Sequence, residues 1–466
     1  MATSSPVDAE LLRRYDRPGP RYTSYPTAPQ FSTGFGEAQL REAALVSNGD
    51  PIPRRLSLYV HVPFCMSPCF YCGCNRIITR DLSRAETYLA RLYREIDMTA
   101  ALFDRDREVI QLHFGGGTPN FLSPAQLQDV VDCLRRHFLF SSSPERDLSI
   151  ELDPRFISAS DVAALGAIGF DRASLGVQDF DPLVQDAVNR VQSVEETRTV
   201  VDACRANGFR SVNIDLIYGL PKQNAAGFTQ TLDTVIDMRP DRLAVYSYAH
   251  LPELFKAQQQ IDAADLPDPD TKLGLLQLAI DKLTQAGYVY IGMDHFALPD
   301  DALAQAQDRG NLHRNFMGYT THADSDLIGL GVSAISHIGN SFSQNPRDLP
   351  TWQAAIDSGR LPVARGMSLN EDDQLRADLI QQLMCQGEIP VAALERRYAI
   401  DFDTYFADAL LQLEPLAADG LVRREPGRIL ATTRGRLLLR NIAMCFDRYL
   451  SQPAATSHTP RFSRAI

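Results

Sequence analysis

Short apolar runs alternate with longer segments of mixed polarity between residue 56 and about residue 300. The short runs are rich in β-branched and aromatic residues, which predicts strands, and the longer segments repeat apolar residues at helical spacing, which predicts helices. The predicted strands are 56–61, 109–114, 148–152, 172–177, 211–218, 242–248 and 288–293. The predicted helices are 83–102, 124–138, 160–168, 194–207 and 226–238. The second helix opens with Ser123 as N-cap and Pro124 at its first position.

Strands that alternate with helices are expected to lie parallel, with the helices packed outside the sheet. Polar or glycine-rich stretches follow several of these strands. They are 61–74, 115–119, Glu151 with Asp153, Gln178, Asp215 and Asp294 with His295. Such folds place functional residues at the carboxyl ends of parallel strands. We therefore predict an α/β fold built on a partial (β/α) barrel, curved and open on one side.

The segment before the first strand, 1–50, is polar and rich in proline and glycine, and we define it as an N-terminal arm. Short helices are expected at 8–15 and 37–47. Residues 18–28 are expected to be an extended loop, because chain-breaking residues stand at both ends. A disordered arm is the alternative, although Arg21 and three nearby tyrosines are an unusual composition for a free tail.

The main domain is predicted to cover 51–350, and its last part holds an apolar run at 327–338 between stretches rich in Gly, His and Asn. A small, mainly helical domain is predicted at 365–450. Its expected elements are helices at 371–385, 391–398 and 405–419, a hairpin around Pro426 and Gly427, and a last helix that opens at 432–435 and runs to 445. Helices followed by a small hairpin resemble a winged helix. The tail, 451–466, has a composition typical of disorder.

Three cysteines lie in one short loop, Cys65, Cys69 and Cys72, with the spacing C-x3-C-x2-C. Three thiolates this close suit a cubane iron–sulfur cluster, for which four thiolates are usual. A deficit of one leaves one iron open to a small molecule, as catalytic zinc sites keep an open position. The loop therefore predicts redox chemistry at a cluster.

Two other uses of cysteine fit less well. Zinc sites pair well-separated C-x2-C units, and no second Cys/His pair here has that spacing. A disulfide framework is not favoured either, since eight cysteines in 466 residues are sparse. The remaining cysteines outside the loop are expected to be small buried hydrophobes. They are Cys133, Cys204, Cys385 and Cys445.

The net charge is −12 and the pI about 5.3, which argues against sequence-independent binding to nucleic acid. The first residues show neither a basic nor an apolar signal region, and no apolar run reaches the roughly 18 residues that span a bilayer. Free thiols without an export signal favour the reducing cytoplasm.

Several polar residues are weak signals individually. The glycine run 115–117 permits close backbone approach, but its spacing fits neither the dinucleotide nor the P-loop motif, and a tight turn would explain it equally well. Glu151 and Asp153 could be a solvated pair. Tyr59 and His61 share one face of the first strand, because residues two apart on a strand point the same way.

Taken together, these segments resemble the radical S-adenosylmethionine superfamily and, within it, the family of oxygen-independent coproporphyrinogen III oxidases (coproporphyrinogen dehydrogenases). The resemblance covers roughly 10–450. The segments that carry it are 18–28, 59–75, 115–119, 150–155, 176–180 with 188–190, 213–222, 248–251, 292–296, 313–321 and 331–335.

The resemblance implies that Cys65, Cys69 and Cys72 bind one 4Fe–4S cluster, whose open iron is chelated by S-adenosylmethionine. A 5′-deoxyadenosyl radical would then oxidatively decarboxylate two propionates of coproporphyrinogen III to vinyls, giving protoporphyrinogen IX. The protein supplies position and electrostatics, and the cofactors supply the hard chemistry. The domain 51–350 would be the radical S-adenosylmethionine domain.

The family binds two S-adenosylmethionines. Carried over by motif, the contacts of the cluster-bound molecule would be Tyr59, Gly116, Glu151 and Ile335. The contacts of the second would be Tyr71, Gly117, Thr118, Gln178, Arg190, Asp215 and Ala249. His61 would be a catalytic residue near the sulfonium, and Arg21 in the arm could pair with a substrate propionate.

Two residues need comment beside this resemblance. Met317 stands where a member of the family has glutamine, and methionine cannot make the hydrogen bonds of glutamine. Cys74, the fourth cysteine of the loop, is not expected to ligate the cluster, and a packed thiol is its simplest role.

Two rival functions are weighed. A paralogous family of radical S-adenosylmethionine haem chaperones lacks the arm segment 21–26 and the fourth cysteine. The second rival is a DNA-binding regulator, which the resemblance to a winged helix and the C-terminal arginines would favour. Against it, the chain is acidic, and fold alone does not give function. These arginines are Arg423, Arg424, Arg428, Arg434, Arg436 and Arg440. Expected partners are coproporphyrinogen III and an electron donor such as a flavodoxin or ferredoxin system. We expect no nucleic acid, no membrane and a monomeric chain.

Overall fold

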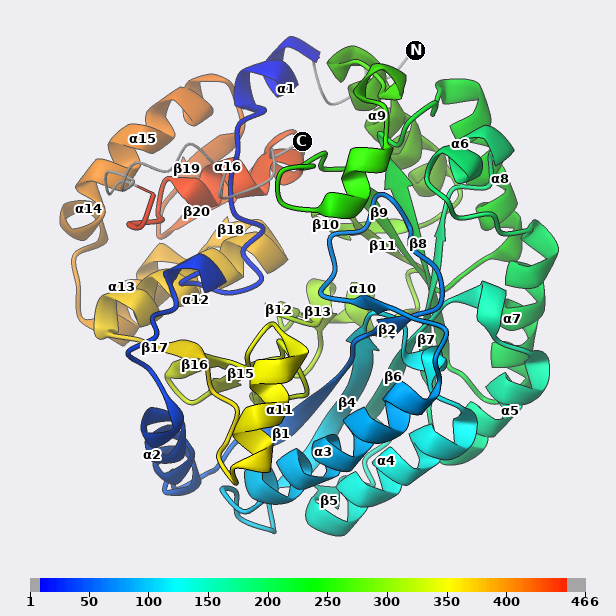
Figure 1. Ribbon diagram of the computed structural model, residues 1–466. Helices are drawn as coiled ribbons and strands as arrows, with labels where there is room; N and C mark the ends of the chain where they lie inside the picture. The colour runs from blue at the N-terminus through cyan, green and yellow to red at the C-terminus, as the bar shows by residue number, and fades with distance from the viewer. Residues whose placement is uncertain (1–8, 451–466) are drawn as a thin grey trace. The chain divides into compact units, whose positions relative to one another are not determined.

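The structure is a computed structural model that describes residues 9–450, and its chain divides into two compact units. The larger unit consists of 31–267 and 324–368. The smaller unit consists of the described residues up to 30, of 268–323 and of the described residues from 369 onward. Figure 1 shows the course of the chain. The predicted tail, 451–466, lies outside the described residues, and the predicted domain boundaries stay predictions.

A parallel sheet forms the centre of the larger unit, with its strands in the order β9-β8-β7-β6-β4-β1. The strands are β1 (Arg55–Val62), β4 (Glu108–Gly116), β6 (Asp147–Leu152), β7 (Arg172–Gln178), β8 (Ser211–Tyr218) and β9 (Arg242–Ser247). This confirms the parallel arrangement predicted for the first six strands.

Helices cover the outer face of this sheet, as Figure 1 shows in light blue, cyan and green. They are α3 (Ser83–Ala100), α4 (Pro124–His137), α5 (Ala159–Ile168), α6 (Pro182–Ala187), α7 (Val194–Ala206) and α8 (Ala225–Met238). The cap predicted for α4 is present, because the Gln126 amide donates to Oγ of Ser123 at 3.3 Å. β1 is buried along almost its whole length, on both faces, although its sequence alternates apolar residues with Ser57, Tyr59 and His61.

The sheet continues beyond β1 with strands that the alternating pattern does not predict. β14 (Ser325–Leu330) pairs with β1 in parallel, and β15 (Ile335–Ile338), β16 (Ser341–Gln344) and β17 (Arg365–Ser368) follow in antiparallel order. The apolar run at 327–338 thus contains two strands and the turn between them. The path of paired strands does not close on itself, so the partial, open barrel is confirmed.

The smaller unit corrects one predicted strand. The predicted strand 288–293 becomes β10 (Val289–Gly292), which pairs antiparallel with β11 (His295–Ala297) and is no further member of the parallel series. The reason is the length of the connection: only Met293 and Asp294 separate the two strands. A parallel pair needs a crossover of a dozen or more residues.

The rest of the smaller unit is mainly helical. Its other elements are α1 (Ala9–Tyr15), α9 (Pro269–Gln285), α10 (Ala302–Asp308), β12 (His313–Asn315), β13 (Gly318–Thr320), α12 (Glu371–Gln386), β18 (Glu388–Ile389), α13 (Val391–Tyr398), α14 (Phe402–Tyr405), α15 (Ala407–Ala418), β19 (Val422–Glu425), β20 (Arg428–Ala431) and α16 (Leu439–Met444). The helix predicted at 405–419 is broken at Phe406, whose side chain is buried. The helix predicted from 432–435 begins as a 3-10 turn.

The part of the arm that belongs to this unit is packed and not free. The Tyr22 hydroxyl donates to Oδ2 of Asp447 at 3.0 Å, and Tyr25 lies against Tyr449 with ring centroids 5.9 Å apart. Burial of these tyrosines explains their presence in a segment otherwise rich in chain breakers. Within residues 9–450, the helices lack the combination of length and apolar character that a bilayer crossing requires.

Candidate active site

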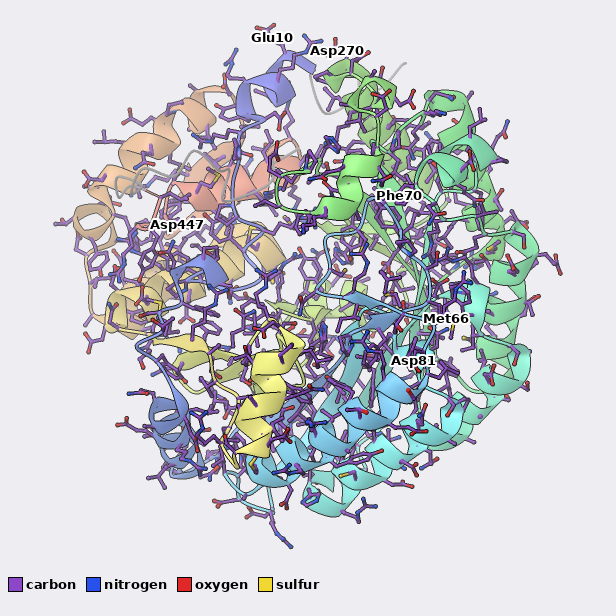
Figure 2. The ribbon with its side chains drawn as sticks, in the orientation of Figure 1. Glu10, Met66, Phe70, Asp81, Asp270 and Asp447 are labelled. Carbon is purple, nitrogen blue, oxygen red and sulfur yellow. The ribbon has the colours of Figure 1, made fainter. Side chains whose placement is uncertain are left out.

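The predicted site residues of the larger unit lie in the carboxyl-terminal halves of its parallel strands or in the segments that follow these strands. They are Tyr59 and His61 on β1, the loop with Cys65, Cys69, Tyr71 and Cys72, Gly116, Gly117 and Thr118 at the end of β4, Glu151 on β6, Gln178 on β7, Arg190 after α6, Asp215 on β8, Ala249 after β9, and Ile335 at the start of β15. Met66 and Phe70 mark the cysteine loop in Figure 2. Strand topology thus collects residues that are far apart in sequence.

Backbone contacts fix the cysteine loop against neighbouring segments. The Phe70 amide donates to the Val188 carbonyl at 2.9 Å, and Nδ2 of Asn189 donates to the Pro68 carbonyl at 2.7 Å. Cys65 and Cys69 are buried, Cys72 is partly buried, and none of the eight cysteines is in a disulfide. The three predicted ligands are therefore available as thiols.

Two arginines lie beside Cys69. Its Sγ is 3.5 Å from Nη1 of Arg190 and 3.6 Å from Nη2 of Arg155. Both arginines also bind Asp153, at 3.2 Å and 2.6 Å. Burial alone would raise the pKa of Asp153, but the charges of Arg190 and Arg155 and the hydrogen bonds from Arg155 hold it below its usual value. The two guanidinium groups place positive charge beside this sulfur, which suits a negatively charged ligand sulfur.

Asp153 and Glu151 are not a solvated pair. Asp153 is buried between arginines, whereas Glu151 is 44% exposed at its side chain and accepts a hydrogen bond from the Gly116 amide at 3.2 Å. Glu151 therefore faces the open end of the sheet and can accept hydrogen bonds from a ligand.

Tyr59 and His61 contact one another, as their spacing on the strand predicts. Nε2 of His61 lies 3.0 Å from the Asn75 carbonyl, which can only accept, so the proton is on Nε2. Nδ1 then accepts from the Tyr59 hydroxyl at 3.0 Å. Burial lowers the pKa of His61, which favours the neutral ring.

In the glycine run, the backbone lies very close to His61 and to the start of the cysteine loop. A Cβ at Gly116, where φ is +119°, would lie 2.7 Å from Cε1 of His61, and a Cβ at Gly117 would lie 2.8 Å from the Phe64 carbonyl oxygen. The Thr118 amide donates to the same carbonyl at 2.9 Å. Both glycines are needed because the end of β4 packs directly on the histidine and on the start of the cysteine loop.

Asp215 is held by polar neighbours on two strands. Oδ2 accepts from the Ser174 hydroxyl at 3.0 Å, and Oδ1 accepts from Nδ2 of Asn213 at 2.8 Å. Burial and the nearby charge of Glu151 raise the pKa of Asp215 to about 6. A partly buried carboxylate with a raised pKa is a frequent mark of a functional site.

Arg190 and Gln178 carry features that a ligand would explain. Nε of Arg190 is buried and has no hydrogen-bond partner among the described residues, although its Nη atoms bind Asp153. Gln178 adopts φ +72°, which is rare for a residue with a side chain. Unpaired buried donors and unusual backbone angles gather at binding sites.

Three residues outside the predicted set contact predicted site residues. Gln258 donates from Nε2 to the carbonyls of Tyr71 and Ala249 at 2.9 and 3.1 Å. His113 lies beside Tyr59 on the neighbouring strand, with ring centroids 5.9 Å apart, and contacts Glu151. Ser174 holds Asp215. Strand register would have indicated His113 and Ser174, but no sequence signal marks Gln258.

Arg21 belongs to the smaller unit, where its Nη2 lies 3.3 Å from Oδ2 of Asp294. Met317 belongs to the same unit, in the turn between β12 and β13, and its amide donates to Oδ1 of Asn315 at 2.8 Å. In this structure the guanidinium of Arg21 is paired with the carboxylate of Asp294, and its predicted pairing with a propionate stays a prediction.

The donor set fits a cluster. Within residues 9–450, no three His, Cys, Asp or Glu side chains gather closely enough to hold a single metal ion. A cubane spreads its ligands over separate irons, so separated thiols do not conflict with it. The Cys65, Cys69 and Cys72 thiols, two adjacent arginines and the half-exposed Glu151 suit a cluster with one iron open to a ligand.

Comparison with known proteins gives consistent matches. The pattern of the Radical SAM superfamily matches residues 59–235, and that of the HemN C-terminal domain matches residues 369–438. The chain is 52% identical to the oxygen-independent coproporphyrinogen III oxidase of Pseudomonas aeruginosa and 49% identical to that of Escherichia coli. Each alignment covers 98% of both proteins. The solved structure of coproporphyrinogen III oxidase from Escherichia coli, described as a radical SAM enzyme, superposes with a TM-score of 0.90 at 48% identity, over 95% of this chain and 99% of that one.

Proposed function

Because the chain belongs to the oxygen-independent coproporphyrinogen III oxidases, which are radical S-adenosylmethionine enzymes, we propose that the polar residues at the carboxyl ends of its strands hold the cofactors of that reaction. The enzyme oxidatively decarboxylates two propionates of coproporphyrinogen III to vinyl groups and yields protoporphyrinogen IX. When bound, a 4Fe–4S cluster held by Cys65, Cys69 and Cys72, together with S-adenosylmethionine, would supply the radical chemistry of this reaction.

Cys65, Cys69 and Cys72 are proposed as the cluster ligands. The observation that carries the proposal is the position of the cysteine loop directly after β1. There, Arg190 and Arg155 lie within 3.6 Å of Sγ of Cys69. These cations stabilise negative charge on sulfur. A fourth protein ligand is not required when a small molecule fills the open iron.

The first S-adenosylmethionine is proposed to contact Tyr59, Gly116, Glu151 and Ile335. Glu151 offers a half-exposed carboxylate to an amino group or a ribose hydroxyl. His61 packs against Gly116, and burial lowers its pKa, which favours the neutral ring. A neutral ring adds no positive charge beside a sulfonium, so we propose His61 as a catalytic residue at this position.

A second S-adenosylmethionine is proposed beside the first, in contact with Tyr71, Gly117, Thr118, Gln178, Arg190, Asp215 and Ala249. The unpaired Nε of Arg190 offers a charged donor to a carboxylate, and Asp215 offers acceptors. Gln258 connects two members of the set through their carbonyls. The unpaired donor is the feature that most favours a bound anion here.

The haem-chaperone alternative is not favoured, because the relatives at 49–52% identity over nearly the full chain are named as oxidases. We propose that the electron donor is a flavodoxin or ferredoxin system. The monomeric state and the cytoplasmic location stay predictions, as does the pairing of Arg21 with a propionate.

The test is an anaerobic assay on the reconstituted enzyme. Coproporphyrinogen III is incubated with S-adenosylmethionine and reductant, with and without cell extract as a source of the final electron acceptor, and the porphyrins are separated after oxidation. We expect protoporphyrin that depends on S-adenosylmethionine. Cleavage of S-adenosylmethionine with unchanged coproporphyrinogen in both arms would contradict the function and favour the haem-handling alternative.

A further inference from the structure

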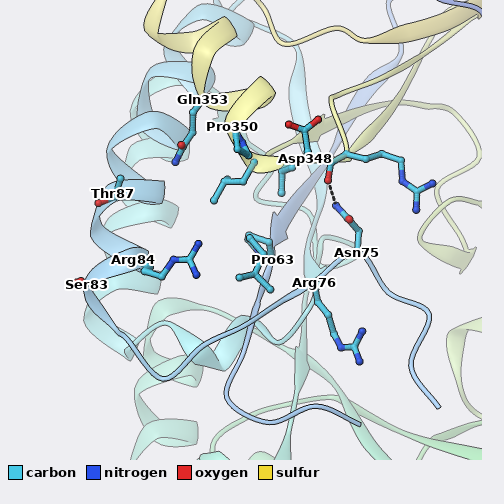
Figure 3. Close-up of a pocket in the computed structure, with 13 residues that line it drawn as sticks. Pro63, Asn75, Arg76, Ser83, Arg84, Thr87, Asp348, Pro350 and Gln353 are labelled. Carbon is cyan, nitrogen blue, oxygen red and sulfur yellow. Dashed lines mark hydrogen bonds between the residues drawn. The ribbon is translucent and has the colours of Figure 1, made fainter. Parts of the chain in front are cut away.

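A cavity of about 620 Å³ opens behind the cysteine loop in the larger unit. It lies between the loop, the start of α3, and the start of α11 (Leu349–Asp357), and Figure 3 shows its lining. Pro63, Ile77, Val332, Leu349 and Pro350 form its apolar surface. The function proposed above uses none of these residues.

The wall of this cavity is continuous with the predicted cluster ligands. Arg76 lines it and donates from Nη2 to the Cys69 carbonyl at 3.0 Å and from Nη1 to the Cys72 carbonyl at 3.5 Å. Asn75 lines it as well, and Nδ2 of Asn75 donates to the Arg347 carbonyl at 2.9 Å. A group held in the cavity would therefore be separated from the cluster by little more than the loop itself.

The lining is basic although the chain is acidic. Three arginines, Arg76, Arg84 and Arg347, contribute to the lining, against one acidic residue, Asp348. Oδ1 of Asp348 accepts a hydrogen bond from the Thr351 amide at 2.9 Å, and Asp348 thereby caps the N-terminus of α11. Arg84 and Arg347 are exposed, and Figure 3 shows Arg84 extending from α3 toward Pro63. In a chain of net charge −12, this is a local reversal of sign.

We propose that this cavity and its rim receive the acidic surface of a small one-electron carrier protein, with Arg84 and Arg347 contacting its carboxylates. The proposal rests on the proposed function, which requires an electron from outside the chain. One electron leaves the reduced flavin or iron–sulfur centre of the carrier and enters the cluster, so the carrier is oxidised and the cluster reduced by the same electron. Opposite charges across such a surface raise the association rate and align the partners.

Carboxylates of a small molecule could also match three arginines. A carrier is favoured because the lining includes Asn75 and Arg76 of the cysteine loop but none of the residues proposed to contact either S-adenosylmethionine. A reductant that approaches from the cavity side therefore does not compete with those molecules.

The test uses the reconstituted full chain, a bacterial flavodoxin as the carrier, and the double variant Arg84→Glu, Arg347→Glu. Binding of oxidised flavodoxin is measured by calorimetry at low and high salt, and cluster reduction by flavodoxin hydroquinone is followed by stopped-flow absorbance. We expect the second-order rate constant of reduction and the affinity both to fall by about 10-fold or more in the double variant. Salt should weaken binding of the wild type more than binding of the variant.

The matched control is Arg105→Glu. Arg105 is also exposed but lies beyond the opposite end of α3, about 27 Å away along an 18-residue helix. Flavodoxin should reduce the Arg105→Glu protein at a rate within about twofold of the wild-type rate. Dithionite, which is small and needs no docking surface, should reduce all three proteins equally.

Two results would overturn the proposal. One is reduction of the double variant by flavodoxin at the wild-type rate. The other is loss of dithionite-driven turnover with a raised KM for coproporphyrinogen, which would assign the cavity to substrate carboxylates. Failure of the proposed function looks different: flavodoxin would bind and reduce the wild type, yet no protoporphyrin would form.

Discussion

His61 packs against the backbone of Gly116, so closely that a Cβ at position 116 would lie 2.7 Å from Cε1 of the imidazole. This contact joins the first strand of the sheet to the end of β4. It also fixes the ring whose nitrogens bind the Tyr59 hydroxyl and the Asn75 carbonyl. The glycine therefore contributes to the position of the histidine, and the histidine to that of the cysteine loop.

Gly116→Ala is expected to abolish most activity while the chain still folds. The new methyl group must displace His61, and a misplacement of about 1 Å can cost about 100-fold in rate. Cleavage of S-adenosylmethionine and the melting temperature should both be measured. Gly208→Ala is the matched control, because φ there is also positive, +82°, but no atom lies within 4 Å of the added Cβ. Wild-type cleavage by Gly116→Ala would contradict the positioning of His61.

Cys72→Ser is expected to lose iron and all activity, because a hydroxyl is a poorer ligand than a thiolate for a soft, sulfur-rich cluster. Iron content and the cluster absorbance report the first loss, and the porphyrin assay reports the second. Cys133→Ala, at a buried position on α4, should keep both. Retention of a full cluster by Cys72→Ser would show that the ligand set is wrong.

Asp215→Asn is expected to keep the cluster and lose turnover, because it removes the negative charge and one of the two acceptor oxygens proposed for the second S-adenosylmethionine. The variant should also change how stability depends on pH. The folded-state pKa of Asp215 is raised to about 6, so ionisation destabilises the folded chain as pH rises between about 4 and 6. Asparagine cannot ionise, and its relative stability should therefore increase over that window. Unfolding in urea at pH 4 and at pH 7 measures this, and an equal stability difference at both would contradict it.

Asp153→Asn is expected to destabilise the chain at neutral pH by about 3 kcal/mol, because it leaves buried arginines without their carboxylate partner. The pKa of Asp153 is lowered in the folded chain, so its contribution is present above the ordinary carboxyl pKa and is lost as pH falls through the folded value. The exposed counterpart is Asp357→Asn, which breaks ion pairs with Arg91 and Arg94 at the surface and should cost much less stability than Asp153→Asn. Chemical denaturation at pH 7 compares the two, and equal costs would argue against a special role for the buried pair.

Gln258→Ala is expected to keep the cluster but to lower conversion of coproporphyrinogen, because the carbonyls of Tyr71 and Ala249 lose their shared donor. Gln259→Ala is the neighbouring control, since Gln259 is exposed and bonds only the Pro252 carbonyl among the described contacts. The assay compares formation of the two vinyl groups in each protein. Equal product from both variants would remove Gln258 from the site.

The pattern of apolar and polar residues by itself predicts the first six parallel strands, the helices between them and the shared face of Tyr59 and His61. These features depend on neighbours in the chain and on the alternation of strand and helix, so local periodicity is sufficient. The cysteine spacing likewise predicts a cluster without knowledge of the fold. Sequence resemblance, and not periodicity, assigned Glu151, Arg190 and Asp215 to ligands.

Only the tertiary structure shows that Glu151 is half-exposed whereas Asp153 is buried. It also places Arg190 against Cys69. Likewise, it brings Gln258 to the carbonyls of Tyr71 and Ala249. The last two of these relationships join segments distant in sequence, and burial decides which carboxylate is paired and which stays open. The antiparallel hairpin of β10 and β11 was mispredicted for a related reason. A strand pattern shows that a segment is extended, but its direction in a sheet follows from the length of the connection and from the strand beside it.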